Sequence, residues 1–131
     1  MNIGFLAQDT KKTLMQNFCI AYRGIICKHN LYATATTGRL ISEATGLPVH
    51  KFLAGDLGGE QQLGALIEHN EIDLVIFLRD PEQHPSHDPD TMNIMSLCDA
   101  HNIPFATNLA SAELLIKALE RGDLDRRELY R

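Results

Sequence analysis

Short apolar runs alternate with amphipathic segments along most of the chain. Five runs bounded by turn residues predict β-strands, at residues 3–7, 31–33, 49–53, 72–78 and 103–106. The run IDLVIFL at 72–78 is continuous and rich in β-branched and aromatic side chains. A run of this kind is typical of a central strand that is covered on both faces.

Between these runs, apolar residues recur every three or four positions, which is the spacing of one helix face. The clearest example extends from Leu14 to Ile26 and predicts one amphipathic helix of about 18 residues. The same spacing recurs around Leu40, Leu63, Ile94 and Leu114. Strands that alternate with helices predict an α/β fold, here a single three-layer domain over residues 1–131 with a mostly parallel five-stranded sheet flanked by helices.

Composition and charge exclude several classes of function. The 131 residues carry a formal net charge of −5, which argues against a broad nucleic-acid or membrane surface, because such surfaces need clustered Lys and Arg. The N-terminal segment MNIGFLAQD is too short in apolar residues for a signal peptide, and no apolar run could span a membrane. We therefore expect a cytoplasmic protein, with a solvated terminal turn in the charged tail at 121–131.

Neither the cysteines nor the histidines form a metal-binding pattern. Cys19, Cys27 and Cys98 lack CxxC spacing and predict reduced thiols in or near the core. His84 and His87 are three residues apart, but a zinc site needs a second cluster of ligands. We therefore expect no metal.

The unusual chemistry lies in the loops that follow the predicted strands, where ligands gather in a parallel sheet. The TATTG segment at residues 34–38 opens a helix, so its N–H groups, hydroxyls and helix dipole would suit a phosphate. Lys12, from another loop, is a candidate counter-charge. Two simpler interpretations stay open, namely that Thr36 is a helix N-cap and that Lys12 is a solvated side chain.

A carboxylate directly follows a glycine-rich loop. Gly55, Gly58 and Gly59 permit positive φ angles and a close approach of the backbone to a ligand, and Glu60 comes next. Glu60 is a candidate base. The alternative is an acidic first-turn residue that the helix dipole stabilises.

The segment HPSHDPD at residues 84–90 adds histidines and carboxylates after the predicted central strand at 72–78. A histidine and a carboxylate that face Glu60 across a cleft would form a set for proton transfer. Alternatively, Asp90 is the N-cap of the next helix and Pro89 its entry residue.

Five segments, in this order over essentially the whole chain, resemble the methylglyoxal synthase family. The family pattern AHDxxK, LYATGTTG, SGPLGGDQQxGA, DLVIFFRDP and HxPD is matched here by AQDTKK, LYATATTG, AGDLGGEQQLGA, DLVIFLRDP and HDPD. The resemblance implies a cytoplasmic, homohexameric lyase that converts dihydroxyacetone phosphate to methylglyoxal and phosphate, as a glycolytic bypass. It implies no metal or organic cofactor, and a small phosphorylated substrate as the partner rather than nucleic acid or a membrane.

The resemblance also implies roles for individual residues. In the family, a carboxylate removes a proton from the carbon next to the carbonyl, and the resulting enediolate expels phosphate. Carried over by position, Glu60 is the base, His87 polarises or protonates the carbonyl oxygen, and Asp90 supports proton transfer. The implied substrate-binding residues are Gln8, Asp9, Lys12, Thr34, Ala35, Thr36, Thr37, Ala54 and Gly55.

The departures from the family pattern fall mainly in these same loops. Where the family has histidine, glycine, serine, proline and aspartate, this chain has Gln8, Ala35, Ala54, Asp56 and Glu60. The longer Glu60 moves its carboxylate by roughly 1 Å, which can cost about a hundredfold in rate. Asp56 adds a charge that opposes an anion. Two alternatives follow: a catalytically impaired or inactive domain that binds a small phosphorylated or anionic ligand, and an enzyme that acts on another small phosphate ester.

Overall fold

The computed structural model describes residues 1–82 and 89–129 and is built on a five-stranded sheet with the order β3-β2-β1-β4-β5. Its strands are β1 (Asn2–Ala7), β2 (Asn30–Ala33), β3 (His50–Lys51), β4 (Leu74–Leu78) and β5 (Phe105–Ala106). Every pairing between neighbouring strands is parallel. The predicted α/β fold with a five-stranded sheet is therefore confirmed.

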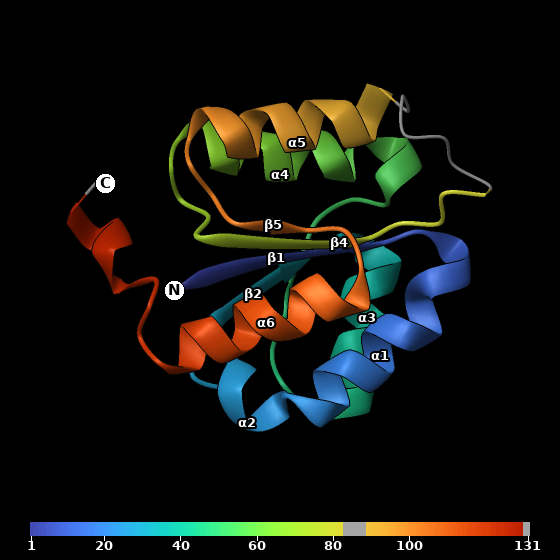
Figure 1. Ribbon diagram of the computed structural model, residues 1–131. Helices are drawn as coiled ribbons and strands as arrows, with labels where there is room; N and C mark the ends of the chain where they lie inside the picture. The colour runs from blue at the N-terminus through green and yellow to red at the C-terminus, as the bar shows by residue number, and fades with distance from the viewer. Residues whose placement is uncertain (83–88, 130–131) are drawn as a thin grey trace.

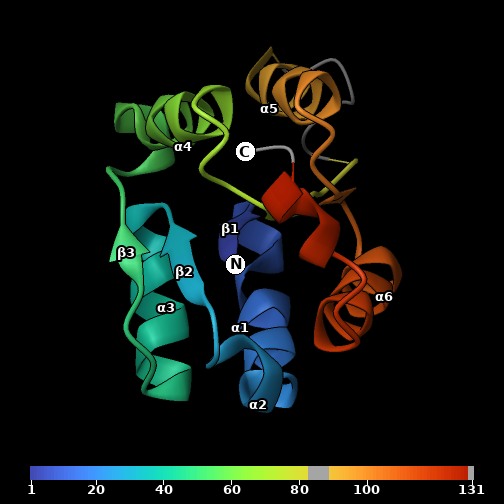
Figure 2. The same cartoon turned by 90° about the vertical axis from the view of Figure 1, so that its left-hand side faces the viewer.

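Helices cover both faces of this sheet and make three layers (Figures 1 and 2). One face carries α4 (Gly59–Glu68) and α5 (Pro89–Ala100). The other face carries α1 (Lys12–Ala21), α2 (Arg23–Ile26), α3 (Ala35–Thr45) and α6 (Leu109–Glu120). Within the described ranges, no helix is long and apolar enough to cross a membrane.

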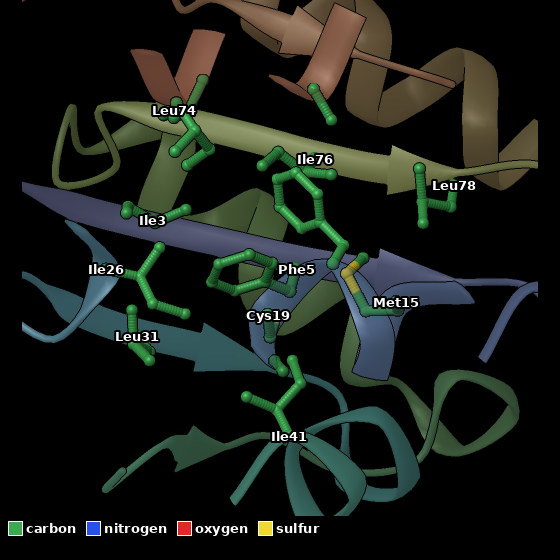
Figure 3. Close-up of a cluster of buried hydrophobic side chains, with 14 of the residues drawn as sticks. Ile3, Phe5, Met15, Cys19, Ile26, Leu31, Ile41, Leu74, Ile76 and Leu78 are labelled. Atoms are coloured by element: carbon green, nitrogen blue, oxygen red, sulfur yellow. The ribbon is translucent and has the colours of Figure 1, made fainter. Parts of the chain in front are cut away.

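Two apolar cores, one on each face of the sheet, hold the layers together. Figure 3 shows the larger one, where Phe5 of β1 lies among side chains that include Met15 and Ile41 from the covering helices. Alternate residues of β4 serve the two cores, because successive side chains of a strand point to opposite faces. Ile76 belongs to the larger core and Phe77 to the other, which explains why this strand is an unbroken apolar run.

The single helix expected over residues 14–26 is in fact two, and this part of the prediction is wrong. Tyr22, at φ −107° and ψ 19°, separates α1 from α2. Its carbonyl accepts the N–H groups of both Ile25 and Ile26 at 3.0 Å, so the chain turns and starts a new helical turn. Met15 of α1 and Ile26 of α2 still reach the same core. The apolar spacing therefore survives the break and could not reveal it.

The expected strands are found in place, but three of them are shorter than their apolar runs. The run at 49–53 yields only His50–Lys51, and the run at 103–106 only Phe105–Ala106. Both are edge strands that pair on one side alone. Their flanking apolar residues, such as Phe52 and Ile103, are buried without extending the ladder. An apolar run in the sequence therefore predicts which residues are buried. The length of the strand depends on how many of them pair with the neighbouring strand.

Arg127 holds the tail against the amino edge of the sheet, so the expected solvated terminal turn is wrong at this residue. It lies in the 3₁₀-helix η3 (Asp125–Leu129), with Nε 3.2 Å from Oδ1 of Asp73. The exposed fractions of the two side chains are only 8% and 0%. The guanidinium also donates to the carbonyl of Asn102 at 2.9 Å and to the side chain of Asn70 at 3.0 Å, while Asp73 accepts the N–H of Asn2 at 2.7 Å.

We expect Arg127→Met to lower the free energy of unfolding by about 3–5 kcal/mol, because it leaves the carboxylate of Asp73 buried without its cation. The matched control is Arg126→Met, since Arg126 is exposed and its loss should change stability by less than about 0.5 kcal/mol. Urea unfolding followed by circular dichroism measures both. Equal stability of the two variants would contradict the assignment.

All three cysteines are free thiols, as the sequence predicts. Cys19 and Cys98 are buried, and burial raises the pKa of each thiol to about 12. Cys27 is exposed, and its Sγ lies 3.4 Å from the carbonyl of Gly24. Cys27 is therefore the cysteine whose thiol a reagent can reach in the folded chain, because Cys19 and Cys98 are buried.

An aromatic disulfide reagent at pH 8 should therefore modify one thiol per chain in the native protein and three after unfolding in guanidinium. Cys27→Ser should remove the native reaction and leave two thiols in the unfolded chain. Rapid native labelling of the Cys27→Ser variant would show that a buried thiol is accessible after all.

Candidate functional site

The candidate site lies at the carboxyl edge of the sheet, where the chain leaves β1, β2 and β3 (Figure 1, right). These three strands are neighbours, so the segments that follow them lie close together. They contribute the start of α1, the start of α3, and the 3₁₀-helix η2 (Gly55–Leu57) with the start of α4. The order of the strands therefore brings together the three segments that follow β1, β2 and β3.

Lys12 is held against the first turn of α3. Its Nζ donates to the carbonyl of Ala7 at 2.8 Å and lies 3.3 Å from Oγ1 of Thr37. The side chain is 21% exposed, so the alternative of a solvated lysine is wrong. Asp9 reaches Nζ at 3.7 Å but is 95% exposed, and an ion pair in such a position contributes little.

Helix α3 begins one residue after Thr34, so the interpretation of Thr36 as the N-cap is wrong. Thr34 is the N-cap, with φ −64° and ψ 161°, and its side chain makes no capping hydrogen bond. Thr36 is exposed, while Thr34 and Thr37 are buried. Three neighbouring threonines all fit the capping pattern, which is why the sequence could not distinguish them.

Gly58 and Gly59, which precede Glu60, are each required by a different structural constraint. Gly58 has φ +103° and is the N-cap of α4, in the left-handed region that side chains rarely adopt. At Gly59, a Cβ atom would lie 2.0 Å from the carbonyl oxygen of Leu53 and 3.0 Å from Cγ2 of Thr34. Only glycine therefore lets α4 begin this close to the first turn of α3.

Glu60 is the second residue of α4, and its carboxylate is turned toward η2. Oε2 is buried, and Oε1 lies 3.6 Å from the position that a Cβ of Gly55 would take. The positive end of the helix stabilises the ionised carboxylate at this position. Glu60 is therefore an acidic residue in the first turn of a helix, as the alternative interpretation of the sequence predicts. The role of a base stays a prediction, and a partly buried carboxylate at this position is compatible with it.

Ala54 and Ala35 make backbone hydrogen bonds at the candidate site. The carbonyl of Ala54 accepts the N–H groups of Leu57 at 2.9 Å and Gly59 at 3.0 Å, which closes η2. The N–H of Ala35 donates to the carbonyl of Leu53 at 3.4 Å. The structure does not describe the side chain of Asp56.

The remaining candidates are His84, His87 and Asp90. His84 and His87 are outside the described residues. Helix α5 begins at Pro89, which confirms that residue as the point of helix entry. Asp90 is the second residue of the helix, so the N-cap interpretation is wrong. Its side chain is not among those the structure describes.

Gln8 joins this edge to the end of β4 through two residues that sequence reasoning missed. Its N–H donates to the carbonyl of Leu78 at 3.0 Å, and its Oε1 accepts the N–H of Asp80 at 2.5 Å. Thr10 in turn donates to Oδ2 of Asp80 at 2.6 Å, and Asp80 is only 9% exposed. The sequence does place a polar pair, residues 79–80, directly after the most apolar strand. Only the pairing of β1 with β4, however, brings this pair beside Gln8.

A cavity of about 580 Å³ lies elsewhere, at the amino edge of the sheet. Its lining includes Asn70, His101 and Arg126, and none of the candidate site residues. The cavity is therefore separate from the candidate site, which lies at the opposite edge of the sheet.

Gly59→Ala should destabilise the protein by about 1–3 kcal/mol, because its Cβ would overlap the carbonyl of Leu53 and force α4 away from α3. The control is Gly24→Ala in α2, where nothing lies within 4 Å of the added carbon. That change should be neutral or stabilising by about 0.5–1 kcal/mol, as for alanine in a helix. Urea unfolding of both variants checks the expectation, and a neutral Gly59→Ala would disprove the close approach.

Known proteins share this sequence and fold. Residues 17–107 match the model of the MGS-like domain. The chain is 64% identical over 129 residues to a methylglyoxal synthase of Caldicellulosiruptor saccharolyticus, covering 98% of this chain and 92% of the relative. It is 53% identical to one from Brevibacillus brevis, covering 100% of this chain and 96% of the relative. The crystal structure of methylglyoxal synthase from Elizabethkingia anophelis NUHP1 superposes with a TM-score of 0.82 at 40% identity, covering 88% of this chain and 76% of that one.

Proposed function

The chain belongs to the methylglyoxal synthase family, and from this membership we propose that it converts dihydroxyacetone phosphate to methylglyoxal and phosphate. It acts as a carbon–oxygen lyase within one domain, residues 1–131. The observation that carries the proposal is the packing of Gly59 against Thr34, which sets a carboxylate beside a helix N-terminus. One group can take a proton from carbon while the other holds the anion.

The phosphate of the substrate binds at the first turn of α3. The helix dipole and the first-turn N–H groups favour an anion there, and Lys12 brings a positive charge to the same turn through Thr37. This local arrangement supports anion binding in a chain whose net charge is −5. The proposed substrate-binding residues are Gln8, Asp9, Lys12, Thr34, Ala35, Thr36, Thr37, Ala54 and Gly55.

Glu60 is the proposed base. It takes a proton from the carbon next to the carbonyl, and the electron pair of that C–H bond forms an enediolate. The enediolate then re-forms a carbonyl as the C–O bond to phosphate breaks and the bond electrons leave with phosphate. The released enol gains a proton on carbon and loses the proton of its hydroxyl to give methylglyoxal. A positioned base of this kind contributes about 10²–10⁴-fold to a rate.

His87 and Asp90 complete the proposed set of catalytic groups. His87 polarises or protonates the carbonyl oxygen, and Asp90 supports proton transfer. The support for both is the HDPD segment of the sequence, which lies in chain order between β4 and α5 and matches the family pattern. The reaction needs no metal or organic cofactor, because the carbonyl itself makes the neighbouring proton acidic.

We also propose that the enzyme works as a cytoplasmic homohexamer in a glycolytic bypass, on a small phosphorylated substrate and without nucleic acid. The family membership supports this, as does the net negative charge of the chain. The alternative of an inactive ligand-binding domain is not favoured. Relatives named methylglyoxal synthase match nearly the whole chain at 53–64% identity, and Lys12 lies 3.3 Å from the hydroxyl of Thr37.

The purified protein should release methylglyoxal and phosphate from dihydroxyacetone phosphate, and Glu60→Gln should lower kcat by about 10²–10⁴-fold because the amide cannot accept the proton. Glu68→Gln, at the exposed end of the same helix, is the matched control and should keep full activity. Enzymatic assay of methylglyoxal between pH 6 and 9 measures both. No product from the wild-type protein at any pH would refute the proposed function.

A further inference from the structure

The peptide groups of Leu53 connect the two helices of the site. Its carbonyl accepts the N–H of Ala35, the first residue of α3, at 3.4 Å. Its N–H donates to Oε1 of Gln62, on α4, at 2.7 Å. The side chain of Leu53 is 51% exposed, so its backbone rather than its packing makes the connection.

Gln62 is placed to fix the start of α4. It lies one helical turn after Gly59, whose own approach to the Leu53 carbonyl leaves no room for a Cβ atom. A backbone N–H can only donate, so the amide of Gln62 must turn its oxygen toward Leu53. The first turn of α4 thus meets residue 53 at two points, which are the Gly59 backbone and the Gln62 amide.

The side chain of Gln62 adds a second restraint to a segment whose backbone already approaches Leu53 closely at Gly59. Gly58 and Gly59 lie directly before Glu60, and glycine has the widest range of backbone conformations. Gln62 is exposed and belongs to neither apolar core, so its side chain contributes to stability mainly through the hydrogen bond with Leu53. Its side-chain hydrogen bond runs from the helix that carries the carboxylate to Leu53, whose carbonyl accepts the first N–H of α3.

We propose that Gln62 is a positioning residue, which sets the distance between the Glu60 carboxylate and the anion-binding turn of α3. The inference rests on the proposed function, in which the substrate is held by its phosphate at α3 while Glu60 attacks a carbon. Loosening α4 then moves the base relative to a substrate that stays bound. A displacement of about 1 Å can cost about a hundredfold in rate.

The test compares Gln62→Met, which keeps the length and loses the acceptor, with Gln62→Glu, which keeps an oxygen at the same place. The control is Gln61→Met, an exposed neighbour in the same helix. Steady-state kinetics with dihydroxyacetone phosphate give kcat and KM. Calorimetric titration with inorganic phosphate measures the anion site alone, and thermal unfolding measures stability.

We expect Gln62→Met to lower kcat about tenfold or more, with the phosphate Kd and KM within about threefold of wild type. Gln62→Glu should recover at least a third of the wild-type kcat, and Gln61→Met should match wild type throughout. Wild-type kcat in Gln62→Met would overturn the inference, as would a loss of phosphate binding or of stability that accounts for the whole effect. If the wild-type protein itself makes no methylglyoxal, it is the proposed function that fails.

Discussion

The contact of Gly59 with the carbonyl of Leu53 is the constraint on which the site depends. A Cβ atom there would lie 2.0 Å from the oxygen, so the two chain segments approach too closely for any residue other than glycine at position 59. This contact decides where α4 begins, and Glu60 is the next residue. The same Leu53 carbonyl accepts the N–H of Ala35. One peptide group thereby fixes the starts of two helices relative to each other.

The sheet supplies the rest of the arrangement. Because β1 lies between β2 and β4, the residues after β1 meet those that follow both neighbours. Lys12 reaches Thr37 on one side, and Gln8 reaches Asp80 on the other. At the opposite edge, Arg127 and Asp73 hold the C-terminal segment in place. The buried ion pair and the candidate site thus lie at opposite edges of the sheet, with the apolar cores between them. Figure 3 shows the larger core.

Much of the fold could be predicted from the sequence, because apolar spacing reports burial and burial defines the strands and helix faces. The break at Tyr22 and the true N-cap at Thr34 could not, since both depend on local dihedral angles that leave the spacing unchanged. The glycine loop drew attention to Glu60, whose role as the base stays a prediction. The partners of Gln8 and Arg127 were missed, because Asp80 and Asp73 are distant in sequence and only the strand order brings them near. His87 lies outside the described residues, so its role stays a prediction.

A crystal structure with phosphoglycolohydroxamate, a mimic of the enediolate, tests the central claim most directly. The account predicts the phosphate of the mimic at the first turn of α3 beside Lys12, and the Glu60 carboxylate within about 3 Å of the hydroxamate, the reach of a hydrogen bond. Gly59 should keep its contact with Leu53. A Glu60 side chain turned to bulk water, or a phosphate bound away from α3, would contradict the account.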